Sequence, residues 1–152
     1  MFESKASEFN IVEKYSVKKI YPRELNINIK PTKFIAKISN KDDVLVGSNG
    51  KLISNKDFKK KLPSIIGKFN SNKFLELKIH LERSGFNFED LKSLIYFSSG
   101  RWDILTNDNV LIKLPNKKIY ESLHLAKKIL NDDNFKMNKF IDLRISNQII
   151  VK

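Results

Sequence analysis

The chain has 152 residues, of which 41% are hydrophobic and 11% aromatic, so it can bury a core and is not disordered by composition. It has no cysteine, which excludes disulfides and thiolate chemistry, and no apolar run of about 18 residues that would span a membrane. The formal net charge of +12 suits a nucleic acid or a membrane surface, but scattered lysines supply nearly all of it, which favours a general residue bias over a functional basic patch.

The N-terminal part of the chain predicts a β-hairpin. Residues 1–14 are interpreted as the end of a helix or a frayed leader. Apolar and polar residues alternate over 25–29, which predicts a half-buried strand, and 15–21 supply its partner strand. The hairpin ends at Pro31, where we place the domain boundary.

A second hairpin is expected after a strand at 34–38. Its strands are residues 44–46 and 51–53, and the turn between them is Gly47-Ser48-Asn49-Gly50. Residues 62–67 are interpreted as a short apolar loop anchored in the core.

A helix is expected next, running to Ser84 and capped by Ser71 or Asn72, with Gly85 as its stop. The alternation of apolar residues over 75–81 also fits a strand, so periodicity alone leaves both possibilities open. Length and the capping residues favour the helix.

Residues 94–115 are the centre of the predicted main domain. They alternate as strand, turn, strand, turn and strand, with Asn109 suited to a left-handed backbone position. A helix follows, with an apolar stripe at Ile119, Leu123, Ala126 and Leu130 and with Asn116 as its cap. Strands at 140–145 and 148–151 close the chain.

Motifs for catalysis, metals or cofactors are missing. His80 and His124 lie far apart on predicted helices without partner ligands, and we expect both to be solvated. The turn at 47–50 lacks the lysine and hydroxyl of a phosphate loop. The sequence therefore predicts no catalytic residue, no metal site and no cofactor.

Two arginines share a local pattern. Arg101 and Arg144 each have an acid two residues away on a predicted strand, Asp103 and Asp142, and such residues share a face. One interpretation is a surface ion pair worth about 0–1 kcal/mol. The other is a guanidinium group held out to a partner's carboxylate.

The last predicted strand, 148–151, is a second open question. It either accepts a strand from another protein at a sheet edge or simply closes the sheet.

The order and spacing of several short motifs resemble the FtsQ/DivIB family of bacterial cell-division proteins. The matching segments are 16–29 (V-x-R-x-Y/W-P-x-x-L-x-I-x-I in the family), 31–36, 46–53, 62–67, 100–104 (R-R-W-x-L), 114–115 and 141–144 (x-D-L-R). The sequence departs from the family pattern at Lys30, where an acid is usual, and at Gly47, where Asp is usual.

The resemblance implies an α+β fold: a partial POTRA-like segment followed by a mostly antiparallel β domain with two helices. Residues 1–31 would be the C-terminal remnant of a POTRA domain, with its apolar strand surface exposed, and 33–152 the β domain. The family's membrane helix and the first POTRA strand and helix are absent from this chain, which we interpret as N-terminally truncated.

The resemblance also implies a non-enzymatic scaffold of the divisome, active in cell division and septum formation. Such a protein lies on the periplasmic side of the cytoplasmic membrane, held there only by the N-terminal helix that this chain lacks. It binds FtsB- and FtsL-like coiled-coil proteins and other divisome components, and no nucleic acid. The alternative is a basic nucleic-acid-binding protein.

The family's partner adds a strand at the C-terminal edge, and its contacts carry over to ten positions of this chain. Ile145 stands where the family usually has an aromatic residue. The predicted contacts are Arg101, Trp102, Arg144, Ile145, Ser146, Asn147, Gln148, Ile149, Ile150 and Val151.

Overall fold

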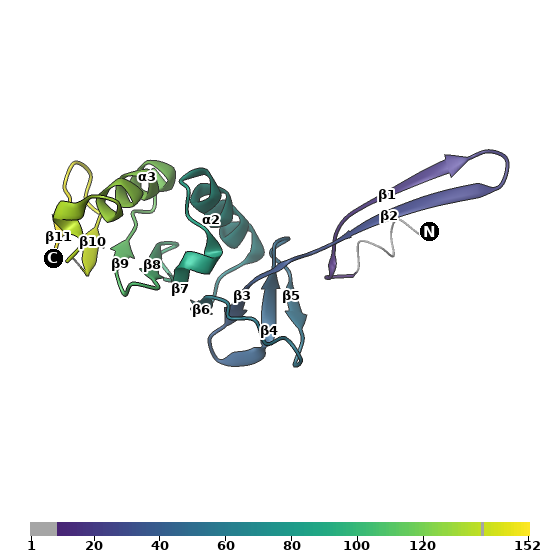
Figure 1. The fold of residues 1–152 in the computed structure, drawn as a ribbon, viewed down its shortest axis with the longest axis horizontal. Coiled ribbons are helices and arrows are strands. Elements are labelled where there is room, and N and C mark those ends of the chain that lie inside the picture. The colour runs from purple at the N-terminus through teal and green to yellow at the C-terminus, as the bar shows by residue number, and fades with distance from the viewer. Residues whose placement is uncertain (1–8, 138) are drawn as a thin grey trace.

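The computed structural model describes residues 9–137 and 139–152. Within these residues the strands form two sheets. One is the pair β1-β2, and the other has nine strands in the order β11-β10-β9-β8-β7-β6-β3-β4-β5. Figure 1 shows the β1-β2 hairpin projecting from a body that holds the large sheet and the helices α2 and α3.

The projecting hairpin consists of β1 (Val12–Ile20) and β2 (Glu24–Pro31), paired antiparallel. The prediction of a hairpin that ends at Pro31 is confirmed. The helix end predicted over 1–14 is wrong from Val12 onward, because β1 already pairs there with Pro31. Residues 9–11 are not helical either, with a turn at 10–11, and residues 1–8 lie outside the described residues.

The first half of the body contains β3 (Phe34–Ile38), β4 (Lys41–Gly47) and β5 (Leu52–Ser54), with the predicted turn between β4 and β5. The apolar loop predicted over 62–67 is instead strand β6 (Ser64–Ile66), which is parallel to both β3 and β7. Such a buried segment needs hydrogen-bond partners for its backbone, and the sheet supplies them.

Of the two structures left open for residues 75–81, strand and helix, the helix is correct. Helix α2 spans Ser71–Arg83. Its cap is Asn70, which directly precedes the predicted cap residues Ser71 and Asn72, and the Asn70 side chain accepts a hydrogen bond from the Lys73 amide at 2.9 Å. Gly85 follows the helix with φ +79°, a conformation that favours glycine.

Helix α3 spans Ile119–Leu130. The prediction that Asn116 caps this helix is wrong, and its side-chain amide instead donates to the Ser99 carbonyl at 3.2 Å. Lys118 takes the cap position in the left-handed region, without a side-chain cap.

The central meander is confirmed as β7 (Leu91–Tyr96), β8 (Trp102–Thr106) and β9 (Leu111–Lys113), after a 3-10 turn at Phe88–Asp90. Asn109 adopts the predicted left-handed conformation, with φ 61°.

After α3 and a 3-10 turn at Asp133–Phe135, strand β10 (Phe140–Asp142) lies parallel to β9. Strand β11 (Ile150–Val151) then pairs antiparallel with β10 and forms the edge of the sheet. The final strands are shorter than the predicted 140–145 and 148–151, because a turn occupies the residues between them.

The core lies between one face of the large sheet and the two helices. A row of side chains in register across neighbouring strands is no more than 1% exposed: Ile65, Leu94, Ile104, Ile112 and Ile141. It belongs to the same buried cluster as Phe74 and Leu77 of α2 and Leu123 of α3. Because strand side chains alternate, the intervening residues lie on the opposite side, which we call the open face.

Candidate functional site

Arg101 is paired with Asp103 on the open face. Its Nε donates to Oδ1 at 3.1 Å and its Nη2 donates to Oδ2 at 3.3 Å. The Asp103 side chain is only 3% exposed, and the guanidinium of Arg101 lies over the ring of Phe97, 4.2 Å from its centroid. The acid and the aromatic ring together fix the direction of the arginine.

Arg144 forms a closer pair with Asp142. Its Nη2 donates to Oδ2 at 2.6 Å, its Nε donates to Oδ1 at 2.8 Å, and its backbone N–H donates to Oδ1 at 3.1 Å. The local ion pair is therefore formed at both arginines. The Arg144 side chain is still 41% exposed, which leaves donors accessible to a second carboxylate.

The two carboxylates respond differently to these surroundings. Burial raises the pKa of Asp103 above its ordinary value, against the attraction of Arg101. The hydrogen bonds from Arg144 lower the pKa of Asp142, with burial acting in the opposite direction. The difference follows first from the deeper burial of Asp103, which penalises its charged form, and then from the shorter and more numerous bonds that Asp142 accepts.

Lys113 joins the two pairs. It lies opposite Asp103 on β8 and opposite Asp142 on β10, and its Nζ lies over the ring of Phe140, 4.7 Å from the centroid. Asp103, Lys113 and Asp142 therefore place charges of alternating sign across three neighbouring strands of the open face. Together with the two arginines they form what we call the charged row: Arg101, Asp103, Lys113, Asp142 and Arg144.

Trp102 does not belong to this face. Its side chain is 2% exposed and packs in the core against Tyr96 and Phe69, with ring centroids 4.7 and 6.0 Å away. The prediction that Trp102 contacts a partner is corrected here. In a strand the side chains on either side of an outward residue point inward, so the positions of Arg101 and Asp103 already placed Trp102 inside.

The C-terminal strand has one free side. Lys152 and Phe140 exchange backbone hydrogen bonds, 3.1 Å from Lys152 N to Phe140 O and 3.0 Å in return. Because an antiparallel strand directs alternate residues to opposite sides, the N–H and C=O of Val151 point away from β10, toward the free edge.

The last strand, predicted over 148–151, begins only at Ile150. Residues 145–148 form a turn, in which the Gln148 amide donates to the Ile145 carbonyl at 3.2 Å and Asn147 has φ 64°. The exposed apolar side chains of this region are Ile145 (56%), Ile149 (46%) and Ile150 (41%).

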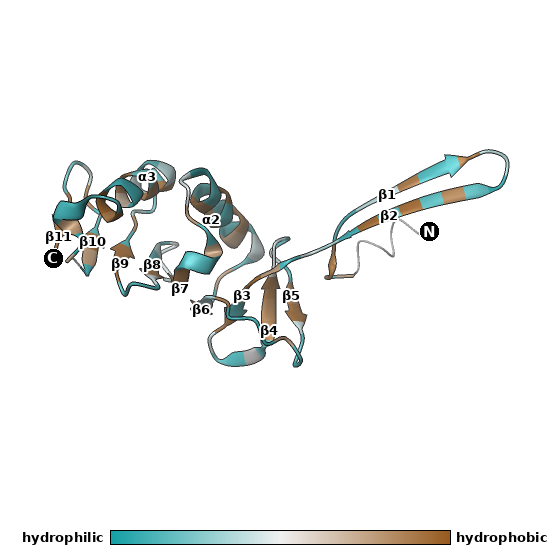
Figure 2. Ribbon diagram, in the orientation of Figure 1, coloured by the Kyte–Doolittle hydropathy of each residue, from teal (hydrophilic) through white to brown (hydrophobic). Residues whose placement is uncertain are grey.

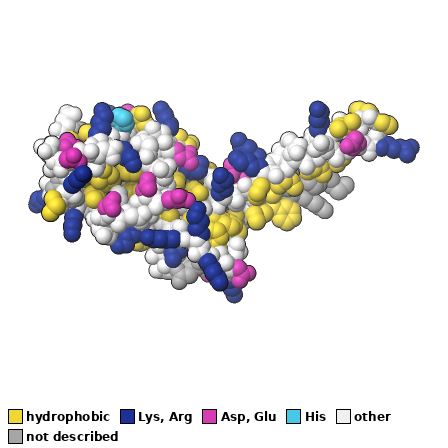
Figure 3. Space-filling view, viewed as in Figure 1, with side chains coloured by type: hydrophobic (Ala, Val, Ile, Leu, Met, Phe, Trp, Pro, Cys, Tyr) yellow, Lys and Arg dark blue, Asp and Glu magenta, His cyan; other side chains and the backbone are white. Residues whose placement is uncertain are grey.

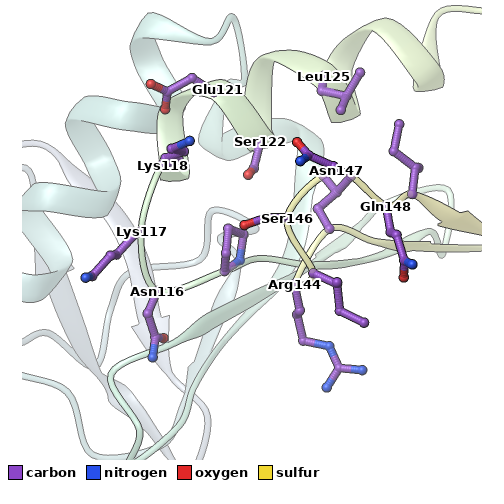
Figure 4. Close-up of a pocket in the computed structure, with 14 residues that line it drawn as sticks. Asn116, Lys117, Lys118, Glu121, Ser122, Leu125, Arg144, Ser146, Asn147 and Gln148 are labelled. Atoms are coloured by element: carbon purple, nitrogen blue, oxygen red, sulfur yellow. The ribbon is translucent and has the colours of Figure 1, made fainter.

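A groove of about 700 Å³ lies between residues 115–118, the start of α3 and residues 143–149. Figure 4 shows Ser122 and Leu125 of α3 facing Asn147 across it, with Lys117 and Lys118 toward one end. The sequence named no residue of α3 as part of the site, because only the fold brings these two segments together.

The two histidines lie on helices α2 and α3 and differ in exposure. His124 is exposed and stacks on Tyr120 with 6.1 Å between ring centroids, whereas His80 is only partly exposed, which corrects the expectation that both are solvated. The described residues contain no cluster of acids and histidines able to hold a metal ion. Among the helices of the described part of the chain, none is long and apolar enough to cross a membrane.

Comparison with known families identifies a match for most of the large sheet and for its helices. The family model described as the C-terminal part of cell division protein FtsQ/DivIB matches residues 35–144. The match runs from β3 to the pair formed by Asp142 and Arg144, and it covers well over half of the chain. No curated protein matches the sequence.

Proposed function

Because this chain belongs to the FtsQ/DivIB family of cell-division proteins, we propose that it is a non-enzymatic divisome scaffold that binds FtsB- and FtsL-like coiled-coil partners at its C-terminal edge. In this proposal residues 1–31 are the end of a POTRA domain and 33–152 the β domain. The protein acts on the periplasmic side of the cytoplasmic membrane, at the division septum.

The observation that carries the proposal is the free edge at β11. A strand at a sheet edge offers unpaired backbone groups to an incoming strand, and main-chain hydrogen bonds then supply affinity. Here the N–H and C=O of Val151 are directed outward. The exposed side chains of Ile149 and Ile150 provide apolar contacts that fix the register of the added strand.

The charged row supports a partner that carries acids. Neighbouring strands lie about 4.8 Å apart, close to the 5–6 Å between side chains three or four residues apart on a helix. An acidic helix crossing β8, β9 and β10 can therefore reach Arg101, Lys113 and Arg144 in turn. Asp103 and Asp142 hold the two guanidinium groups in position for that contact.

The groove beside α3 supplies the polar and apolar wall that such a segment needs on its way to β11. Leu125 and Ile149 offer apolar surface, and Lys117 and Lys118 add positive charge at the start of α3. Cationic surroundings again favour an acidic partner.

The test is a direct titration with an FtsB- and FtsL-like pair. We expect Arg144→Glu to weaken binding well over tenfold, about 1.4 kcal/mol or more, because a carboxylate of the partner would then face another acid. Arg23→Glu is the matched control, since it makes the same charge change on the projecting hairpin. Equal affinity of the Arg144→Glu variant and the unchanged protein would contradict the proposal.

The alternative, binding of nucleic acid, rests on the net charge of +12. On the face drawn in Figure 3, Lys and Arg side chains are spread among acids rather than gathered into one stripe. This alternative requires DNA affinity that falls steeply with salt. Filter binding at two salt concentrations distinguishes the two functions.

A further inference from the structure

The far end of the β1-β2 hairpin combines basic and apolar side chains that the proposed function does not use. We call residues 18–25 the hairpin tip. Tyr21 is 87% exposed, Leu25 49% and Ile20 40%. Lys18, Lys19 and Arg23 are exposed beside them, and Glu24 is the single acid of the segment.

The charges of the tip are not neutralised by neighbours. Within residues 9–137 and 139–152, no salt bridge joins Lys18, Lys19 or Arg23 to an acid. By contrast, Lys30 at the base of the same hairpin is paired with Glu13 at 3.1 Å. The exposed positive charge is therefore concentrated at the end that lies farthest from the body (Figure 1).

The shape of the hairpin presents this tip to a flat surface. Strand β1 has nine residues, which corresponds to a length of about 30 Å. Figure 3 shows hydrophobic, Lys and Arg side chains together at the outer end, clear of the body. The base is held to the body by hydrogen bonds, from the Asn49 side chain to the Asn10 carbonyl at 2.8 Å and from the Asn10 side chain to the Leu52 carbonyl at 3.0 Å.

We propose that the hairpin tip binds the surface of a bilayer that contains anionic lipids. Lys18, Lys19 and Arg23 would contact lipid headgroups, while Tyr21, Ile20 and Leu25 enter the boundary between headgroups and acyl chains. Tyrosine favours that boundary because its ring is apolar and its hydroxyl is polar, and lysine stems extend along apolar surface while their charge stays in water. This inference goes beyond the divisome-scaffold function and does not depend on it.

An anionic bilayer suits the tip better than an apolar pocket in another protein. The three cations carry charge that an anionic surface complements, each strengthening binding about fivefold. Figure 2 shows apolar residues alternating with polar ones along the two strands, which places the apolar residues of each strand on one face. The continuous apolar surface of the hairpin therefore lies on the strands, whereas the tip combines apolar and basic side chains. Mixed basic and apolar composition is typical of surfaces that bind the membrane interface.

The experiment measures co-sedimentation of the whole chain with vesicles, either neutral phosphatidylcholine or phosphatidylcholine with about one third phosphatidylglycerol, at 0.1 M salt. We expect binding to the anionic vesicles only. Replacing Lys18, Lys19 and Arg23 by serine should weaken it about a hundredfold, from three losses of about fivefold each.

The matched control replaces Lys56, Lys59 and Lys61 by serine. These lysines are exposed in the segment between β5 and β6, and the change in net charge is the same. Screening at 0.1 M salt acts over about 10 Å, so the control should keep its binding within about twofold. Equal losses in the two triple variants would overturn the proposal, because the attraction would then belong to the whole charged surface.

A second readout locates the contact. Tyr21→Trp places a fluorescent side chain at the tip, where 87% exposure makes the change harmless to the fold. Brominated lipids in the anionic vesicles should quench this residue but not Trp102, which is 2% exposed in the core. Absence of quenching at position 21 in sedimented protein would also overturn the proposal, as would self-association through the hairpin in place of vesicle binding.

Discussion

Substituting Val151 by proline tests strand addition at a single backbone group. Proline lacks the amide N–H, and at an edge strand it is tolerated where that N–H faces outward. The outward N–H of this strand is that of Val151, because the hydrogen bonds to β10 are made by its neighbour Lys152. The Val151→Pro variant should therefore keep β11 in the sheet while losing one donor to the partner.

The expected size of the effect follows from that one bond. A backbone hydrogen bond contributes about 0.5–1.5 kcal/mol net, and a partner carbonyl left buried without a donor costs about 1–3 kcal/mol. We therefore expect Val151→Pro to weaken binding of the partner pair by about ten- to a hundredfold. Isothermal titration with the FtsB- and FtsL-like pair measures this loss.

Val151→Thr is the matched variant, since threonine keeps the N–H and the β-branched shape. It should bind within about threefold of the unchanged protein, and near-equal thermal unfolding of both variants shows that the sheet edge is intact. Full affinity in the proline variant, or equal weakening in both variants, would refute strand addition through Val151.

Three further outcomes are expected for stability. Gly67→Ala should lower the free energy of unfolding in urea far more than Gly85→Ala does. Both glycines have positive φ, and for Gly85→Ala, where nothing lies within 4 Å of an added Cβ, the expected loss is about 1–2 kcal/mol. A Cβ at Gly67 would in addition lie 2.2 Å from the Tyr96 carbonyl oxygen. Ile112→Ala removes a fully buried side chain at the centre of the core row and should lower the free energy of unfolding by about 2–5 kcal/mol. The pKa of Asp142 is lower in the folded state than in the unfolded state, so its ion pair stabilises the protein at pH values above the unfolded-state pKa. The Asp142→Asn variant should therefore be less stable than the unchanged protein at pH 7. The difference in stability should shrink as the pH falls through the folded-state pKa.

The sequence predicted best where neighbouring residues decide the structure. The central meander follows from alternation around Trp102, and both Arg-x-Asp and Asp-x-Arg pairs follow from the rule that residues two apart in a strand share a face. The same alternation explains why Trp102, which the family resemblance predicted as a partner contact, lies in the core.

Pairings between distant segments could not be predicted in this way. Strand β6 is short and apolar, and only its two parallel neighbours, β3 and β7, distinguish it from a buried loop. The groove beside α3 likewise depends on residues 115–118 and 143–149 meeting in space. The edge position of β11 depends on β10 crossing over to lie parallel to β9, which no local pattern specifies.

The continuous sheet also sets the distance between its two margins. The hairpin leaves the body beside β3, β4 and β5, whereas β11 closes the opposite margin, and in the described part of the chain eight strand-to-strand steps separate β5 from β11. At about 4.8 Å a step, this is a span of roughly 40 Å along the hydrogen-bonding direction of the sheet. A chain docked at β11 therefore lies about that far from the opposite margin, beside which the hairpin leaves the body.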